Sequence, residues 1–347
     1  MSETKKWYEQ SGAEGDICVS TRVRFARNLS RFPFPAKMTD EQARTLIDET
    51  SRALAASRIG GDFRLIDMEQ ASATERSTLV ERHLISPDLA NGSRPRAVLV
   101  SSDESVSVMI NEEDHLRIQV LEAGLAPEKA LERAKAIDDV FDAALGYAFD
   151  EKLGYLTSCP TNLGTGMRVS VMLHLPALEA AHEISGMISG AGGMGFTARG
   201  IYGEGSAAEG SLYQFSNRIT LGYDEDDVAK RMLSLAKQII TRERSLRGQM
   251  LARDRDGLED SVWRAVGTLK YARRIDTAEA LELLGRVRTG ASLGVIPADY
   301  GRLNGLLWAV RPSSIVTRSG KDELDPSERD KLRAELLHEA IEPAKTI

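Results

Sequence analysis

The sequence predicts an α+β fold, in which a large sheet flanked by helices is followed by a small, all-helical C-terminal domain. Strand-like alternation of apolar and polar residues ends near residue 221, and beyond Asp224 the apolar residues recur with a helical period. The length of 347 residues allows one large domain or two. We therefore expect a boundary near residues 245–260, with a first domain at 15–248 and a second at 255–347.

The first domain combines predicted strands with predicted helices. Residues 16–27, DICVSTRVRFAR, alternate apolar and polar side chains, so Arg22 and Arg24 should point to one face of a strand. Further strands are predicted at residues 63–68, 97–101, 106–111, 116–121, 155–159, 167–175, 196–202 and 211–221. Helices are predicted at residues 39–57, 73–84, 127–149 and 176–188.

The second domain is predicted from helical patterns alone. They cover residues 226–254, 258–274, 276–288, 298–310 and 325–342. The last helix has a strong start, because Asp325 can cap it, Pro326 suits the first helical position and Glu328 can complete a capping box.

Composition limits the class of protein. Hydrophobic residues make up 42% of the chain and charged residues 28%, which excludes global disorder. The 45 basic and 52 acidic residues give a net charge of −7, which argues against a nucleic-acid-binding surface. Cys18 and Cys159 cannot build a disulfide framework and match no metal-binding spacing, so no metal site is predicted. We find neither a signal peptide nor a membrane-spanning run, and expect a cytoplasmic protein.

The common nucleotide-binding motifs are missing from the sequence. It contains neither GxxxxGKS/T nor the HRD and DFG motifs of ordinary protein kinases. Gly190, Gly192 and Gly195 match GxGxxG, but they follow a helical pattern rather than a strand. A dinucleotide site is therefore not expected.

Five arginines stand in strand or loop patterns, where long cations seldom serve a core. They are Arg22, Arg24, Arg117, Arg168 and Arg199. A guanidinium group binds phosphate oxygens through paired hydrogen bonds, so several arginines can neutralise a triphosphate without a P-loop lysine. The residues alone leave two interpretations open, a nucleotide-binding cradle or solvated arginines paired with some of the 52 acids.

Acidic residues in two segments are candidates for an acceptor site. The segment NEEDHLR at 111–117 contains Glu112, Glu113 and Asp114, and Glu204 lies in a glycine-rich segment. If Glu113 and Glu204 meet across a cleft, they can grip a cationic acceptor, and a glycine-hinged loop can exclude water. Acids facing water in a turn are the alternative.

Cys159 and two histidines are further candidates. Cys159 precedes a tight turn, and nearby arginines would favour its thiolate, with a small buried side chain as the alternative. Cys18 is expected to be buried. His83 and His174 could contact a nucleotide or serve the core, and His83 is the stronger candidate because its neighbours do not form a continuous strand pattern.

Four motifs resemble, in order and spacing, those of the phosphagen kinases, which are ATP:guanidino phosphotransferases. They are STRVR at 20–24, NEEDHLR at 111–117, CPTNLGTGMR at 159–168 and RGIYGE at 199–204. The resemblance covers residues 15–245 and implies an antiparallel sheet that binds Mg-ATP through arginines. The ATP-binding residues that it implies are Ser20, Thr21, Arg22, Val23, Arg24, His83, Arg117, Arg168, Val169, Ser170, Val171, Met172, Arg199, Gly200, Ile201, Tyr202, Gly203 and Glu204.

The same resemblance implies catalytic residues and the cofactors ATP and Mg²⁺. Glu113 corresponds to the glutamate that pairs with the acceptor guanidinium and takes its proton, Glu204 to a second clamp from the loop, and Cys159 to the reactive cysteine. Only 19 residues precede Ser20, where metabolite-specific members carry a helical domain. We therefore expect an open acceptor pocket.

The added helical domain makes the arrangement similar to the McsB-type protein-arginine kinases within that superfamily. In that group the domain mediates dimerisation and carries an RDxxRA motif that binds phosphoarginine. Residues 329–334 match the motif, and the implied ligands are Arg329, Asp330, Arg333 and Ala334. Arg329 and Arg333 are four apart on one helix face, so both could reach a phosphate, with a solvated helix face as the alternative.

This resemblance implies a homodimeric kinase that transfers the ATP γ-phosphate to arginine side chains in proteins and marks them for degradation under stress. It also implies allosteric control and three partners, a zinc-binding activator, a heat-shock repressor and a Clp unfoldase. Two alternatives stay open, a kinase of a small free guanidino metabolite and a non-catalytic phosphoarginine reader. No membrane or direct nucleic-acid partner is expected.

Overall fold

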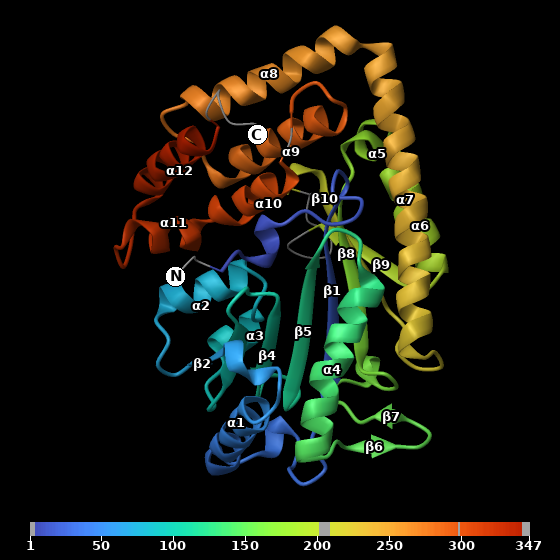
Figure 1. The fold of residues 1–347 in the computed structure, drawn as a ribbon, viewed down its shortest axis with the longest axis vertical. Coiled ribbons are helices and arrows are strands. Elements are labelled where there is room, and N and C mark those ends of the chain that lie inside the picture. The colour runs from blue at the N-terminus through green and yellow to red at the C-terminus, as the bar shows by residue number, and fades with distance from the viewer. Residues whose placement is uncertain (1–3, 201–208, 298, 342–347) are drawn as a thin grey trace.

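The computed structural model describes residues 4–200, 209–297 and 299–341. Its centre is an eight-stranded sheet with the order β2-β3-β4-β5-β1-β8-β10-β9, in which every neighbouring pair is antiparallel (Figure 1). The strands are β1 (Cys18–Arg27), β2 (Phe63–Asp67), β3 (Ala97–Ser101), β4 (Val106–Ile110), β5 (Leu116–Ala123), β8 (Met167–His174), β9 (Phe196–Gly200) and β10 (Leu212–Asn217). A separate hairpin consists of β6 (Phe149–Asp150) and β7 (Gly154–Tyr155). The predicted α+β class is confirmed.

Helices pack on both faces of this sheet. The first face carries α1 (Asp40–Ala55), α4 (Pro127–Leu145), α5 (Pro176–Ala180), α6 (Ile184–Gly193) and the long α7 (Glu225–Arg253). The second face carries α2 (Ala73–Glu81), α3 (Pro87–Asn91), α8 (Arg255–Tyr271), α9 (Thr277–Ser292), α10 (Tyr300–Ala309), α11 (Pro312–Ser319) and α12 (Pro326–Ala340).

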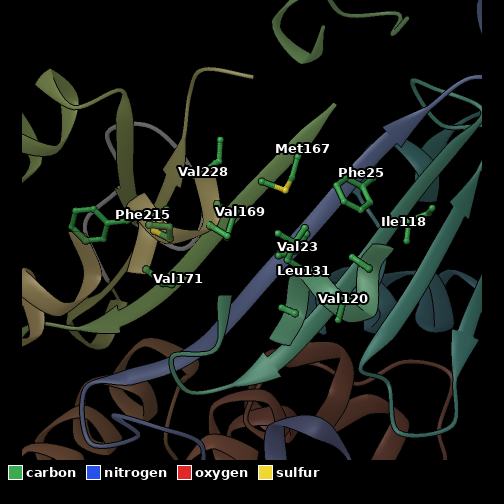
Figure 2. Packing of buried hydrophobic residues seen from close by; sticks show 14 of the residues in the cluster. Val23, Phe25, Ile118, Val120, Leu131, Met167, Val169, Val171, Phe215 and Val228 are labelled. Atoms are coloured by element: carbon green, nitrogen blue, oxygen red, sulfur yellow. The ribbon is translucent and has the colours of Figure 1, made fainter. Parts of the chain in front are cut away.

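Alternation along β1 separates an apolar face from a charged one. Val23 and Phe25 are fully buried and pack with Leu131 of α4 on the first face (Figure 2). Arg22 and Arg24 alternate with these residues along the strand and therefore project from the second face, as the alternation predicted. One strand thus supplies both a core and a row of cations.

The C-terminal helices share their core with the sheet. Trp308 of α10 and Leu284 of α9 belong to the same apolar cluster as Met109 and Leu121 of the second face. Figure 1 shows these helices gathered over one end of the sheet. The change from strands to helices after Asp224 is therefore real, but the later helices do not enclose a core of their own.

Aspartates set the starts of the long C-terminal helices. Asp224 caps α7, and Asp254, between α7 and α8, caps α8. The predicted capping box is present, because Asp325 accepts a hydrogen bond from the Glu328 amide and Glu328 accepts one from the Asp325 amide. No helix in the described ranges is long and apolar enough to cross a membrane.

The differences from the predicted elements have local causes. The helix predicted at 127–149 stops at Leu145, because Gly146 adopts a φ of 71°. The segment predicted as one helix at 176–188 forms α5 and α6, which are separated near His182, where φ is 56°. The short helices α3 and α11 were not predicted, because five and eight residues show too little periodicity.

Arg27 at the end of β1 forms a buried ion pair. Its side chain is fully buried, and its Nη2 lies 2.7 Å from Oδ2 of Asp138 on α4. Tyr147 donates a hydrogen bond to Asp138, and the Arg27 guanidinium lies 3.5 Å from the ring centroid of Tyr155. Removing one partner of such a pair leaves an uncompensated buried charge.

We predict that Asp138→Ala lowers the free energy of unfolding by about 3–5 kcal/mol, the usual cost of breaking a buried pair. Denaturant unfolding would measure it. Asp48→Ala removes an exposed aspartate of α1 and serves as the control, with an expected change within about 0.5 kcal/mol. Equal small changes in both variants would contradict a structural role for the Arg27 pair.

Candidate active site

Five arginines lie on the second face of the sheet. They are Arg22, Arg24, Arg117, Arg168 and Arg199. Antiparallel pairing places Arg24 opposite Arg168 on one side and opposite Gln119 on the other. Arg22 is two residues from Arg24 on β1, and Arg117 is two residues from Gln119 on β5, so both side chains project from the same face. Arg199 joins it through Gln214, which pairs with both Arg199 and Met172.

The electrostatics of these arginines suit the binding of an anion. Burial and then repulsion by Arg117, Arg199 and Arg168 together lower the pKa of Arg22 to about 9. Burial and the same arginines, with Arg22, hold the pKa of Arg24 well below its usual value. Nε and Nη2 of Arg24 have no hydrogen-bond partner among the described residues. A polyphosphate would supply the missing acceptors and charge.

Protein groups orient two of the five. Arg117 Nη1 lies 2.7 Å from both carboxylate oxygens of Glu112, and Arg168 Nε donates to the Asn217 carbonyl at 3.4 Å. Arg199 lies near the end of β9. The predicted ligands Ile201, Tyr202, Gly203 and Glu204 lie outside the described residues. The proposed pairing of Glu113 with Glu204 is therefore not addressed by the structure.

Asp114 ties the segment carrying Glu113 to the segment carrying Cys159. Its buried carboxylate accepts hydrogen bonds from Nδ2 of Asn28 at 2.6 Å and from the Ser158 amide at 2.7 Å. Glu113 itself is exposed. Partial desolvation of its carboxyl by neighbouring groups nevertheless raises the pKa of Glu113, and Asp114 raises it further. The network places an exposed, relatively basic carboxylate beside the arginine row.

The two cysteines have different environments. Cys159 is partly exposed, and its Sγ lies 3.0 Å from Oγ1 of Thr161. It is close enough to Arg168 to raise the pKa of that guanidinium, although burial and the other arginines outweigh this effect. Cys18 is fully buried, and burial raises its pKa to about 12, so it remains a thiol, as expected.

The two histidines also differ. His83 borders a small cavity beside Ser20, Arg22 and Ser170, and its Nε2 has no hydrogen-bond partner within the described chain. His174 is buried instead against Arg247, with Nδ1 3.1 Å from Nη2. His174 lies on the same face of the sheet but is covered by α9 and α10, whereas His83 borders the same cavity as Arg22.

Sequence reasoning missed the polar residues between the arginines. Gln119 and Gln214 lie on the same face, and Gln119 Nε2 donates to the His83 carbonyl at 2.5 Å. Asn28 was also missed, although it holds Asp114. The alternation of side chains could have identified Gln119, which is two residues from Arg117 on the same predicted strand. Gln214 lies opposite Arg199 in the neighbouring strand.

The predicted phosphoarginine ligands lie at the start of α12. Arg329 and Asp330 are partly exposed, whereas Arg333 is 1% exposed and Ala334 is equally buried. The Arg333 guanidinium donates to two backbone carbonyls, at 2.7 and 2.8 Å, and to Asp330 Oδ1 at 2.7 Å. Arg329 donates to a carbonyl at 3.1 Å. In this structure the buried Arg333 side chain links the C-terminal helices to one another by hydrogen bonds. Among the four predicted ligands, Arg329 and Asp330 are the accessible ones.

We predict that Arg24→Met stabilises the ligand-free protein by about 0.5–2 kcal/mol, because it removes a partly buried cation from a repulsive group. It should also reduce the stabilisation of the protein by inorganic tripolyphosphate, which amounts to about 2.7 kcal/mol for wild type at a hundredfold excess over Kd. Thermal unfolding with and without tripolyphosphate measures both effects.

Arg44→Met, which changes an exposed arginine of α1, is the control and should leave both quantities unchanged. An Arg24→Met protein that is less stable yet keeps the full tripolyphosphate effect would refute the anion site.

Two family models match consecutive parts of the chain. Residues 45–246 match the ATP:guanido phosphotransferase C-terminal catalytic domain, and residues 255–346 match the protein-arginine kinase McsB C-terminal domain. Among solved structures, lombricine kinase shares the fold with a TM-score of 0.60 at 22% identity, covering 72% of this chain and 73% of that one. The duplicated taurocyamine kinase from Schistosoma mansoni also has a TM-score of 0.60 at 22% identity, and the match covers 78% of this chain and 40% of that one.

Relatives similar to this chain over nearly their whole length are protein-arginine kinases. That of Brevibacillus brevis is 46% identical over 338 residues, which is 96% of this chain and 94% of the relative. That of Pelotomaculum thermopropionicum is 43% identical over 335 residues, 95% and 94% respectively. The chain belongs to the McsB-type protein-arginine kinases of the ATP:guanido phosphotransferase family.

Proposed function

We propose that the arginine face binds the triphosphate of ATP and that Glu113 takes the proton when the γ-phosphoryl group moves to an arginine side chain of a protein. The observation that carries this assignment is the row of five arginines, of which Arg117 alone is paired with a carboxylate in the described part of the chain. Glu113 lies beside this row, where its carboxylate could pair with the guanidinium group of the acceptor. The two alternatives from the sequence, a free-metabolite kinase and a non-catalytic reader, receive no support from the full-length relatives.

The chemistry requires a base because a guanidinium group, with a pKa above about 12, has no free lone pair at neutral pH. As a bond forms from a guanidino nitrogen to the γ-phosphorus, the bond from that phosphorus to the β,γ-bridging oxygen breaks. ADP leaves with that electron pair, and the nitrogen proton passes to the Glu113 carboxylate. The arginines stabilise the negative charge on the transferring and leaving oxygens.

Magnesium has no ready-made protein site among the described residues. They contain no group of three histidine, cysteine or carboxylate side chains that could hold a metal ion, and Glu112 is engaged by Arg117. Mg²⁺ commonly binds through substrate phosphates and keeps several waters. We therefore expect Mg²⁺ to enter as Mg-ATP and to neutralise phosphate charge there.

The remaining ligands follow from the motif match. Ser20, Arg22, Arg24, Arg168, Ser170 and Met172 would contact the nucleotide from the second face, together with residues 199–204. The side chains of Val23, Val169 and Val171 are buried in the core of the first face, so these three residues are not expected to contact the nucleotide through their side chains. Glu204 would be a second clamp on the acceptor guanidinium, and a Cys159 thiolate would orient this group. The partial exposure of Cys159 and its proximity to Arg168 are consistent with that role.

The cellular role rests on family resemblance. We expect a cytoplasmic homodimer under allosteric control that marks proteins for degradation during stress. A zinc-binding activator, a heat-shock repressor and a Clp unfoldase are the expected partners. Residues 15–248 would carry catalysis, and residues 255–347, which share a core with the sheet, would carry dimerisation and phosphoarginine binding.

We predict that Glu113→Gln lowers phosphoryl transfer by about 10²–10⁴-fold, the usual contribution of a general base, while ATP binding stays within about twofold of wild type. The assay mixes the protein with Mg-ATP and an unfolded arginine-containing protein and quantifies acid-labile phosphate on arginine. Calorimetry measures ATP binding.

Glu151→Gln, which changes an exposed glutamate outside the site, is the matched control and should transfer phosphate normally. Unchanged turnover with weakened ATP binding in Glu113→Gln would show that Glu113 is a nucleotide ligand instead of the base.

We predict that Arg329→Ala weakens the binding of free phosphoarginine by about 10–100-fold, as expected for a lost charge-assisted hydrogen bond, without changing thermal stability. Calorimetry with the amino acid tests this, and Arg264→Ala on exposed α8 surface is the control. The same affinity in both variants would remove Arg329 from the phosphoarginine site.

A further inference from the structure

His83 is held in an uncommon backbone conformation at the end of α2. Its φ is 58°, in the left-handed region that residues other than glycine rarely adopt. The His83 amide donates to the Val80 carbonyl at 2.9 Å, and the His83 carbonyl accepts from Gln119 of the arginine face. The main chain of His83 is thus fixed to the sheet that carries the arginines.

The C-terminal helices hold the imidazole ring itself. The ring centroids of His83 and Trp308 of α10 are 5.0 Å apart and the rings are nearly perpendicular, at 88°. Trp308 is 3% exposed and is supported in turn by Trp7, at a centroid distance of 6.0 Å. The indole of Trp308 thus packs against the imidazole, and both rings border the cavity that also contains Arg22.

A second set of contacts fixes the helix that precedes His83. The Glu81 carboxylate accepts hydrogen bonds from the amide of Ser313 at 2.9 Å and from that of Ser314 at 3.2 Å, at the start of α11. The hydroxyls of Thr78 and Thr317 lie 3.0 Å apart. Figure 1 shows α2 lying beside α11. The C-terminal helices therefore constrain His83 through its backbone as well as its ring.

His83 and Glu113 lie at opposite ends of the arginine row. Glu113 precedes β5, whose first residue, Leu116, pairs with Arg27. The cavity at His83 is bordered by Ser20 and Leu121, toward the other end of the same two strands. With the γ-phosphate near Glu113, the nucleoside end of ATP would point toward His83.

The small cavity at His83 has a mixed lining, in which the indoles of Trp7 and Trp308 accompany polar side chains. It is also bordered by Arg22, Ser170 and Gln214, and its volume of about 10 Å³ suits about one water molecule. Burial and then Arg22 lower the pKa of His83 to about 3, so its ring is neutral near pH 7 and adds no further positive charge beside the arginines.

We infer that Trp308 and Glu81 are positioning residues for nucleotide binding, through which the C-terminal helices hold His83 against the nucleoside end of ATP. The inference rests on the proposed ATP site. No C-terminal residue needs to touch the nucleotide. The contacts of Trp308 and Glu81 with His83 and α11 make the helical domain part of the nucleotide site.

The test compares two ligands in the full-length protein by calorimetry. Trp308→Leu and Glu81→Gln should each weaken Mg-ATP binding by about tenfold, the effect of about 1.4 kcal/mol, while inorganic tripolyphosphate, which lacks the nucleoside, binds as to wild type. Trp308→Phe keeps an aromatic edge and should restore most of the ATP affinity. Trp263→Leu removes an exposed indole of α8 and serves as the control.

Equal losses for ATP and tripolyphosphate, or normal ATP binding in both variants, would overturn the inference. Adding His83→Ala to Glu81→Gln should cause little further loss of ATP affinity, since both act on one contact. Glu81→Gln decides the matter if Trp308→Leu does not fold. Failure of wild type to bind ATP would refute the proposed function instead.

Discussion

Mutual repulsion among guanidinium groups on one face of the sheet is the constraint on which the rest of the structure depends. Arg22 and Arg24 are partly buried, close to three further arginines, and largely without acceptors from the described chain. Such an arrangement costs stability and must be supported by packing elsewhere. The opposite face supplies it, where Val23, Phe25 and their neighbours are fully buried beneath α4 and α7.

The acceptor side is organised by different means. Glu113 is exposed, yet its segment is fixed by Asp114 and Asn28 on one side and by the Glu112–Arg117 pair on the other. The carboxylate that we propose as the base therefore keeps its position without being buried, and positional accuracy is a large part of phosphoryl-transfer catalysis. Exposure also leaves room for an acceptor that is attached to a protein chain.

Local patterns predicted most of the fold and the arginine row. Alternation in residues 16–27 was enough to assign Arg22 and Arg24 to one face, and Asp325 with Glu328 marked a helix start. Long-range features could not be predicted in this way. The burial of Arg333 depends on backbone carbonyls contributed by other segments. The edge-to-face contact of His83 with Trp308 joins positions more than two hundred residues apart. Neither leaves a periodic signal in the sequence.

The core shared by the sheet and the C-terminal helices has a consequence for biosynthesis. Met109, Leu121 and Met172 on the second face are covered by helices that follow Asp254. A nascent chain that has reached only α7 would expose this apolar surface to solvent until the last helices leave the ribosome. The protein is therefore expected to need chaperone protection late in translation, and a premature stop in α8 would yield an aggregating product instead of a smaller kinase.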